Sequence, residues 1–179
     1  MKNNIILEGF MGSGKTTVGI RLSYKLFMTV VDTDKLIEKE QGMTVSEIFE
    51  KEGEEAFRKL ETACLQKLLD EGNKQIISLG GGTPIREENR ELLKKLGIVV
   101  YLRVKPQTVY DRIKNDTARP LLQCENPLQR ICDMMFARKE AYESTADIII
   151  DTDELSFDEI INLIRDAVEQ YEKDRGISL

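Results

Sequence analysis

The sequence contains no histidine and no tryptophan, and it has only three cysteines and four prolines among 179 residues. Without histidine, Ser-His-Asp and Cys-His catalysis and imidazole metal sites are excluded, so any general base must be a carboxylate, a lysine or water. The cysteines Cys64, Cys124 and Cys132 form no C-x-x-C pair. We therefore expect reduced thiols, and neither a disulfide framework nor a zinc site.

Long apolar runs and an excess of positive charge are also missing. No apolar stretch approaches the roughly 20 residues of a membrane span, and the first residues lead into a strand, not into a signal peptide. The net charge of −6 disfavours nucleic acid as a partner, because phosphate backbones are bound by basic surfaces. We expect a cytoplasmic monomer that binds small molecules, with no membrane partner and one domain over residues 1–179.

Short apolar runs alternate with longer segments of helical period along the chain. The runs that predict strands are 4–8, 29–34, 75–80, 97–104 and 146–151. The segments that predict helices are 15–26, 33–41, 45–50, 54–71, 87–96, 106–114, 127–143 and 157–173. Because the strand runs are almost continuously apolar, we expect an α/β fold whose parallel sheet is buried on both faces by helices.

The segment GFMGSGKTT, residues 9–17, directly follows the first predicted strand and opens a helix. It fits the P-loop pattern G-x-x-x-x-G-K-[ST], in which glycines turn successive backbone N–H groups inward around an anion. Lys15 can reach the β- and γ-phosphates of a nucleotide, and the Thr16 hydroxyl can ligate Mg²⁺. The alternative is a chance glycine turn. The nucleotide-binding residues expected here are Gly12, Ser13, Gly14, Lys15, Thr16 and Thr17.

Two aspartates end the second predicted strand in the motif VVDTD. At the period of two of a strand, Asp32 and Asp34 point the same way, toward the edge of the sheet where ligands bind. The two carboxylates could then serve a metal ion and an acceptor substrate, respectively. The alternative is that Asp34 only caps the helix that follows.

Three further segments carry candidate site residues, each with a simpler structural explanation. Arg58 and Glu61 are three residues apart on a predicted helix and could form an ordinary surface pair. The glycines 80–82 follow a strand and allow a ligand to approach the backbone, or they form a bare loop. Arg119 lies in a long polar connection typical of an active-site lid, whereas Arg138 taken alone would be a solvated helix residue.

Together these motifs resemble the shikimate kinase family. The resemblance runs in order through GFMGSGKTTVG, DTD, GEEAFRKLE, SLGGGTP, NDTARPLL and RKEAY, and it covers about residues 4–150. It implies the P-loop fold of nucleoside monophosphate kinases, a three-layer α/β/α fold with a five-stranded parallel sheet in the order 2-3-1-4-5. It also implies ATP-dependent phosphorylation of the 3-hydroxyl of shikimate, in the biosynthesis of chorismate and aromatic amino acids.

The same resemblance implies roles for individual residues. The residues expected to bind shikimate are Asp34, Phe57, Arg58, Gly80, Gly81, Gly82 and Arg138. The residues expected to act in catalysis are Asp34, Lys15 and Arg119. Lys15 and Arg119 would contact phosphates and Arg112 would stack on adenine, while Thr16 would ligate Mg²⁺ with help from Asp32. The shikimate-binding region would span about 33–61, and the lid about 112–124.

Two other functions fit parts of the pattern. A kinase of the same architecture could phosphorylate gluconate or a nucleoside monophosphate, but the segments GEEAFR and SLGGGTP supply no obvious base-recognition residues. A non-catalytic nucleotide switch would usually carry the base-reading motif N-K-x-D, which is absent from the sequence. The residues therefore favour a small-molecule kinase.

Overall fold

The fold is taken from a computed structural model that describes residues 3–71, 74–114 and 124–176. The elements in chain order are β1 (Ile5–Glu8), α1 (Lys15–Leu26), β2 (Thr29–Asp32), α2 (Thr33–Gln41), α3 (Val45–Glu71), β3 (Gln75–Ser78), the 3₁₀ turn η1 (Thr83–Ile85), α4 (Glu87–Leu96), β4 (Ile98–Arg103), α5 (Pro106–Ile113), α6 (Pro127–Thr145), β5 (Ile148–Asp151) and α7 (Phe157–Arg175). The alternation of strand and helix predicted from the sequence is therefore confirmed.

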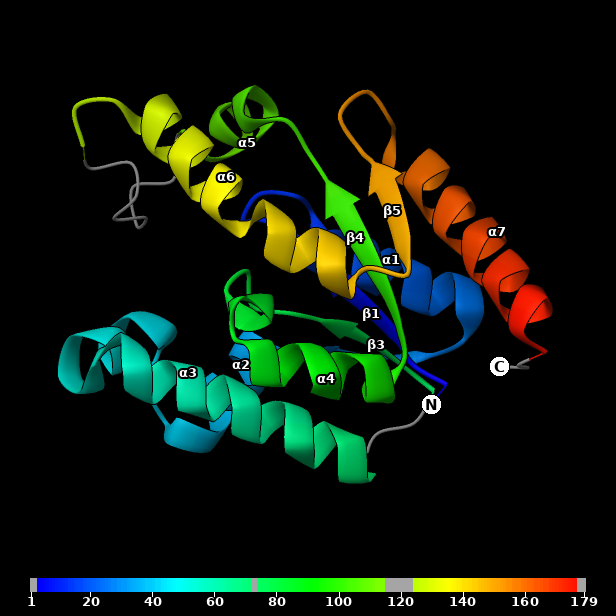
Figure 1. The fold of residues 1–179 in the computed structure, drawn as a ribbon, viewed down its shortest axis with the longest axis horizontal. Coiled ribbons are helices and arrows are strands. Elements are labelled where there is room, and N and C mark those ends of the chain that lie inside the picture. The colour runs from blue at the N-terminus through cyan, green and yellow to red at the C-terminus, as the bar shows by residue number, and fades with distance from the viewer. Residues whose placement is uncertain (1–2, 72–73, 115–123, 177–179) are drawn as a thin grey trace.

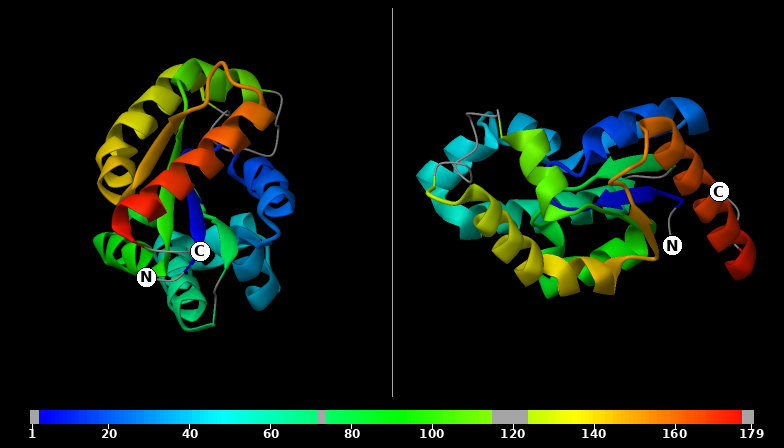
Figure 2. Two further views of the ribbon diagram at one scale, coloured as in Figure 1. Left: turned by 90° about the vertical axis from the view of Figure 1, so that its right-hand side faces the viewer. Right: turned by 90° about the horizontal axis from the view of Figure 1, so that it is seen from above.

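The five strands form one parallel sheet in the order β2-β3-β1-β4-β5. This is the predicted order. Helices α1 and α7 cover one face, and α3, α4 and α6 lie on the other, so the molecule has three layers (Figures 1 and 2). The chain leaves the central strand β1 at its carboxyl end, beside the carboxyl ends of β3 and β4, where parallel α/β sheets bind their ligands.

The core follows the alternation of side chains along the central strands. Ile5 and Leu7 of β1 pack on the side of α1 and α7, while Ile6 packs on the side of α3 and α4. The expectation that every strand is buried on both faces holds for β1 and nearly for β3 and β4. It is wrong for the edge strands β2 and β5, which have exposed residues because each pairs on one side only.

Several elements differ from their predicted bounds by one or two residues; the third strand ends at Ser78, not at residue 80, and the fifth begins at Ile148, not at residue 146. The second strand ends at Asp32, two residues early, and Thr33 already begins α2. The two helices predicted over 45–50 and 54–71 lie within the element α3, and the break between them is confirmed by the non-helical conformation of Gly53, with φ of 85°. This break places the ring of Phe49 4.8 Å from that of Phe57.

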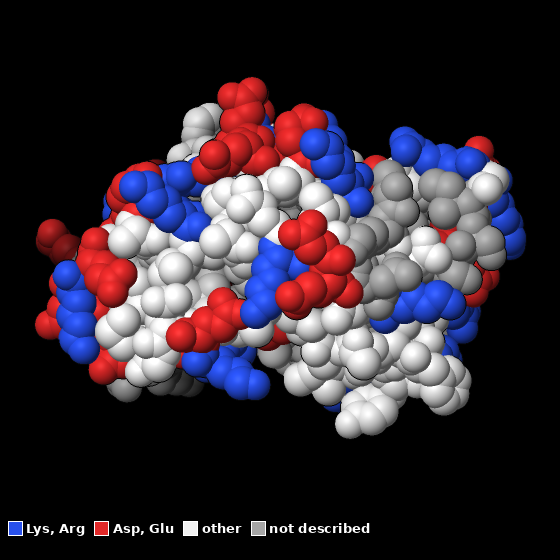
Figure 3. Space-filling view, turned by 90° about the horizontal axis from the view of Figure 1, so that it is seen from below, with Lys and Arg blue, Asp and Glu red and all other residues white. Residues whose placement is uncertain are grey.

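On the face shown in Figure 3, basic and acidic side chains are interspersed among uncharged ones, without a broad area of one sign. Among the helices that the structure describes, none is both long enough and apolar enough to cross a membrane.

Candidate active site

The P-loop forms a cup between the end of β1 and the start of α1. Gly12 and Gly14 adopt positive φ angles of 78° and 94°, a region that residues with side chains rarely occupy. Gly14 is the N-terminal cap of α1, and among the described residues no side-chain hydrogen bond caps the helix there, so the helix begins at the cup with its backbone. The helix dipole adds positive potential at the same point, so the cup is suited to bind an anion.

Lys15 and Thr16 stand at the mouth of this cup. The Lys15 ammonium donates hydrogen bonds to the carbonyl oxygens of Gly9 (2.8 Å) and Phe10 (3.1 Å) and is thereby held against the loop. The Thr16 hydroxyl donates to Asp32 Oδ2 at 2.9 Å and lies 3.5 Å from the Ser78 hydroxyl. Hydroxyl and carboxylate oxygens are the donors that Mg²⁺ prefers, usually together with phosphates and water.

Asp34 reaches the cup from α2, not from a strand. The interpretation by strand period is wrong here, because Asp32 ends β2 and caps α2 by accepting a hydrogen bond from the Lys35 amide. Asp34 therefore lies in the first helical turn, and the alternative that it is the cap is also wrong. Its Oδ1 atom is buried and has no hydrogen-bond partner among the described residues. Burial, reinforced by the neighbouring carboxylates Asp32 and Glu61, raises the pKa of Asp34 to about 6.

Arg58 on α3 is paired with two carboxylates, the buried Glu61 and the exposed Glu54. Its guanidinium donates to Glu61 Oε2 at 2.6 Å and to Glu54 Oε1 at 2.9 Å, and its side chain is only 12% exposed. Glu61 is 1% exposed and also accepts a hydrogen bond from the Thr83 hydroxyl. The guanidinium packs so closely on Gly82 that a Cβ atom there would collide with Arg58 Nη1. Arg58 and Glu61 are thus paired, as the simpler explanation held, but the pair is buried beside the glycines.

Arg138 approaches the same glycines from α6. It donates to the Gly81 carbonyl at 3.3 Å and lies over the ring of Phe10, with 5.6 Å between the guanidinium carbon and the ring centroid. The Tyr142 hydroxyl, one helical turn further along α6, donates to the same carbonyl. Arg138 is therefore held in place by the P-loop and the glycine segment and is not a freely solvated side chain.

The glycines 80–82 are the meeting point of these groups. A Cβ atom at Gly80 would lie 2.5 Å from Asp34 Oδ1, so Asp34, Arg58 and Arg138 each contact or closely approach one of three successive residues. A cleft of about 390 Å³ opens beside them. It is lined by Met11, Gly12, Gly14, Lys15, Thr16, Thr17, Asp32, Asp34, Leu79, Gly81, Arg112 and Phe157. The cleft thus contains both the phosphate cup and Asp34.

The remaining predicted residues fall into three groups. Arg112 lies in the cleft and donates to the Gly12 carbonyl at 3.0 Å. Phe57 is 3% exposed and belongs to the core beside Phe49. Like Arg58 and Arg138, it is not among the residues that line the cleft, and its contact with shikimate stays a prediction. Arg119 and most of the predicted lid lie outside the described residues. Tyr142 was missed, although its spacing of four from Arg138 in RKEAY places both on one helix face.

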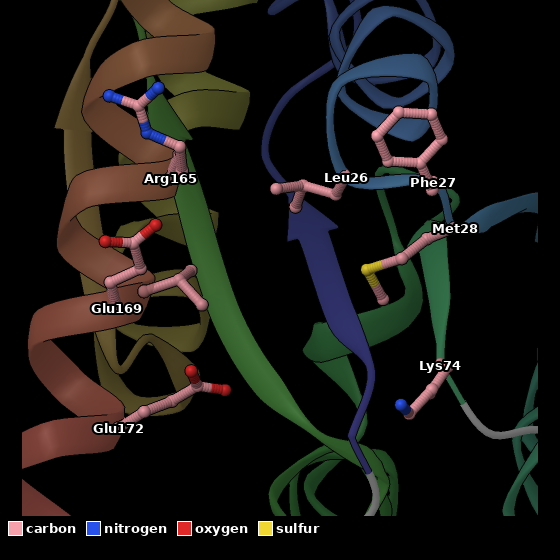
Figure 4. A pocket seen from close by; sticks show the side chains of 8 residues that line it. Leu26, Phe27, Met28, Lys74, Arg165, Glu169 and Glu172 are labelled. Carbon is pink, nitrogen blue, oxygen red and sulfur yellow. The ribbon is translucent and has the colours of Figure 1, made fainter. Parts of the chain in front are cut away.

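A second hollow lies at the opposite end of the sheet, between α7 and the turn that follows α1 (Figure 4). Its volume is about 330 Å³, and Phe27, Met28 and Val168 supply apolar parts of its wall. It contains none of the predicted site residues and no glycine loop. Size therefore does not distinguish the two hollows, whereas the convergence of charged groups and backbone amides does.

Comparison with known proteins points to one family. A sequence model described as shikimate kinase matches residues 11–169. A shikimate kinase from Thermodesulfovibrio yellowstonii is 44% identical over 170 residues, which are 95% of each chain. The solved structure of shikimate kinase from Acinetobacter baumannii in complex with shikimate is 38% identical, with a TM-score of 0.88 over 95% of this chain and 94% of that chain. The structure of the Aquifex aeolicus shikimate kinase is 34% identical, with a TM-score of 0.78 over 93% and 96% of the two chains.

Proposed function

The chain belongs to the shikimate kinase family, and from this premise we propose that one cleft binds ATP and shikimate face to face. The protein is an ATP-dependent kinase that phosphorylates shikimate. The γ-phosphoryl group passes to the 3-hydroxyl of shikimate and ADP is released. The observation that carries this arrangement is the convergence of Asp34, Arg58 and Arg138 on glycines 80–82, beside the cup that contains Lys15.

The two arginines grip the carboxylate of shikimate. A guanidinium presents two parallel N–H donors to a carboxylate, and the geometry is specific for planar anions. Glu61 and Glu54 hold Arg58 in position and balance its charge before the substrate arrives. Arg138 is fixed independently on Phe10 and the Gly81 carbonyl, so the grip is largely preformed.

Asp34 receives the hydroxyl that is phosphorylated. Its unpartnered Oδ1 accepts the hydrogen of the shikimate hydroxyl and thereby satisfies a buried acceptor. With a pKa of about 6, its carboxylate is mostly ionised at neutral pH and can take the proton as the new bond forms. Because phosphoryl transfer passes through a loose transition state, alignment of the hydroxyl contributes more than the strength of the base.

Lys15 and the amides of the cup stabilise the charge that develops on the phosphoryl oxygens. The adjacent oxygens of Thr16 and Asp32 fit Mg²⁺, so Thr16 would bind the ion and Asp32 would assist it. The ion would neutralise charge on the β- and γ-phosphates. Arg112, which donates to the Gly12 carbonyl, is proposed to stack on adenine, and Arg119 is proposed as a second phosphate contact.

The acceptor is tested by coupling ADP release to an indicator with ATP and Mg²⁺. Shikimate, gluconate and nucleoside monophosphates are each added alone, and a reaction without acceptor measures hydrolysis. Turnover with shikimate, at least a hundredfold above every other condition, is expected. Equal rates with and without acceptor would instead identify a nucleoside triphosphatase, and preference for gluconate or a nucleotide would identify the related kinases.

The carboxylate grip is tested with Arg58→Met and Arg138→Met. Loss of a charge-assisted pair should raise KM for shikimate about 10–100-fold and leave KM for ATP within about threefold. Arg130→Met, an exposed arginine on the same helix as Arg138, is the matched control. If ATP binding weakens more than shikimate binding, the two arginines serve the nucleotide and the assignment is wrong.

A further inference from the structure

Glu8 is an ionisable residue in the centre of the sheet that the proposed reaction does not use. It is the last residue of β1, directly before the P-loop, and it is 0% exposed. Its neighbour across the sheet is Tyr101 of β4. Within the described part of the chain, Glu8 forms no ion pair. A buried carboxylate without an ion-pair partner is costly when ionised, so its hydrogen bonds determine whether it is protonated.

Those hydrogen bonds all pass through one hydroxyl. Thr145 Oγ1 on α6 lies 2.9 Å from both Glu8 Oε1 and Glu8 Oε2, and also 2.9 Å and 3.0 Å from the carbonyl oxygens of Ala141 and Tyr142. Four acceptor oxygens thus surround a hydroxyl that carries a single hydrogen. If Glu8 were ionised, it would receive at most that one hydrogen. If Glu8 is protonated, it donates to Thr145, and Thr145 donates to a main-chain carbonyl.

The partner of Glu8 belongs to the helix that holds the acceptor substrate. Arg138, Tyr142 and Thr145 are spaced by four and three residues and share one face of α6. The first two contact the Gly81 carbonyl, and the third contacts Glu8. Glu8 is therefore the point at which α6 is joined to the strand that leads into the phosphate cup.

We propose that Glu8 is a neutral carboxylic acid that donates a hydrogen bond to Thr145, and that it is a positioning residue for Arg138. It does not touch the reacting atoms. It holds α6 at the distance from β1 that places Arg138 opposite the nucleotide. The positioning part rests on the proposed function, whereas the protonation state does not.

The charged and titratable groups around Glu8 agree with a retained proton. Burial raises the pKa of Glu8 to about 8, and the negative charge of Asp147 before β5 acts in the same direction. The Thr145 hydrogen bond and the positive charge of Lys15 on α1 act in the opposite direction without overcoming burial. Tyr101 and Tyr142 also face this site, and burial raises the pKa of each phenol, so both stay neutral across the range of interest.

The protonation state has a direct consequence for stability. Between the unfolded pKa near 4.5 and the folded pKa near 8, the native state holds a proton that the unfolded state has lost. Stability from this group is therefore fully present below about pH 4.5 and is lost as the pH rises toward 8. The unfolding equilibrium constant should rise about tenfold per pH unit in that range.

The first experiment compares the wild type with Glu8→Gln by urea unfolding at pH 5, 6, 7 and 8. The ratio of their unfolding constants should change about tenfold per pH unit, because the amide keeps the donor but cannot ionise. Glu140→Gln, an exposed acid on α6, should show a flat ratio. A flat ratio for Glu8→Gln would mean that Glu8 is ionised throughout, and it would overturn the proposal whatever the activity of the protein.

The second experiment measures KM for shikimate and for ATP from pH 7 to 9.5. In the wild type, KM for shikimate should rise at least threefold above pH 8 while KM for ATP stays constant, and in Glu8→Gln both should stay flat. Thr145→Val, which removes the partner hydroxyl, should raise KM for shikimate at every pH. If the stability ratio behaves as expected but these values of KM do not, the positioning role is wrong. Absence of shikimate turnover in the wild type would contradict the proposed function alone.

Discussion

The two halves of the cleft differ in composition, because one consists of backbone groups and the other of side chains. The phosphate cup consists of backbone, with Gly12 and Gly14 in conformations that fix the direction of the amides, and a single lysine folded onto the loop. The acceptor half consists of side chains from three helices, α2, α3 and α6, which meet at glycines 80–82. The cup is thus local in sequence, whereas the acceptor half depends on the tertiary fold.

This difference explains which properties each half can confer. A cup of backbone amides does not distinguish one polyphosphate from another, because its N–H donors contact only phosphate oxygens. The proposed acceptor half would distinguish one small acid from another, because Asp34, Arg58 and Arg138 come from separate elements. Damage to the cup should therefore abolish transfer with every acceptor, whereas damage to the acceptor half should change KM or kcat for shikimate and leave KM for ATP unchanged.

The strongest test of the cup is Lys15→Met. Removing the ammonium that the loop carbonyls hold at the mouth of the cup should lower kcat about 10²–10³-fold, because charge on the transferred phosphoryl group loses a preorganised partner. The change is measured by ADP release at saturating shikimate. Lys25→Met, an exposed residue in the last turn of the same helix, should leave kcat unchanged. If Lys15→Met retains more than a third of the wild-type kcat, Lys15 does not stabilise the transferred group.

In the acceptor half, Asp34→Asn should have the next largest effect. It should lower kcat about 10²-fold with little change in KM for shikimate, because the amide still contacts the hydroxyl but cannot take its proton. The wild-type kcat should fall below about pH 6 as Asp34 is protonated, and the kcat of the variant should show no such decrease. Asp70→Asn on α3, which is exposed, is the control. Unchanged turnover would remove Asp34 from the catalytic residues.

The same variant should be more stable than the wild type. Because burial raises the pKa of Asp34 to about 6, the ionised form is disfavoured in the folded state, and the native protein loses stability as the pH rises from about 4 to 6. Asparagine removes that penalty, so Asp34→Asn should gain about 1–3 kcal/mol at pH 7 and nothing near pH 4. Thermal unfolding at the two pH values measures the gain, and equal stability at pH 7 would mean that the carboxylate is not disfavoured by its site.

The smallest effect is expected from Gly82→Ala. A Cβ atom there would collide with Arg58 Nη1, so the guanidinium must move, and KM for shikimate should rise about 3–10-fold. If the effect passes through Arg58, Gly82→Ala should add nothing further in an Arg58→Met background. Additive changes in KM would show that Gly82 affects the substrate independently of Arg58.

Much of this arrangement could be predicted from the sequence, because it follows from local patterns. The P-loop sets its own geometry, and the alternation of apolar runs with helical segments determines the layers. Most elements begin and end within two residues of the predicted bounds. No local pattern predicts the order of the strands, because pairing joins segments far apart in the chain. That order was implied by the family resemblance alone, and the sheet confirms it.

The errors lie where a tertiary contact overrides a local pattern. Asp34 reaches the cleft from a helical turn, since the chain leaves the sheet as soon as β2 runs out of pairing with β3 at Ser78. Phe57 packs in the core beneath Arg58, and its contact with shikimate stays a prediction. Glu8 was treated only as part of an apolar run. An acid at the end of a buried strand indicates that the cost of burying its charge must be removed, either by a bound proton or by a partner.

The break of α3 at Gly53 has a consequence for how substrate preference can change. In an uninterrupted helix, residues eight positions apart are separated by about 12 Å along the axis, so Phe49 and Phe57 could not touch. The backbone turn folds one ring onto the other, and the Arg58 guanidinium lies within 6 Å of both. A Cβ atom at Gly53 would meet nothing within 4 Å, so a larger residue at this position is disfavoured by the positive φ angle and not by lack of space. Redesign of the enzyme for acids of other sizes could therefore start from this backbone joint, which directly precedes Glu54, an ion-pair partner of Arg58.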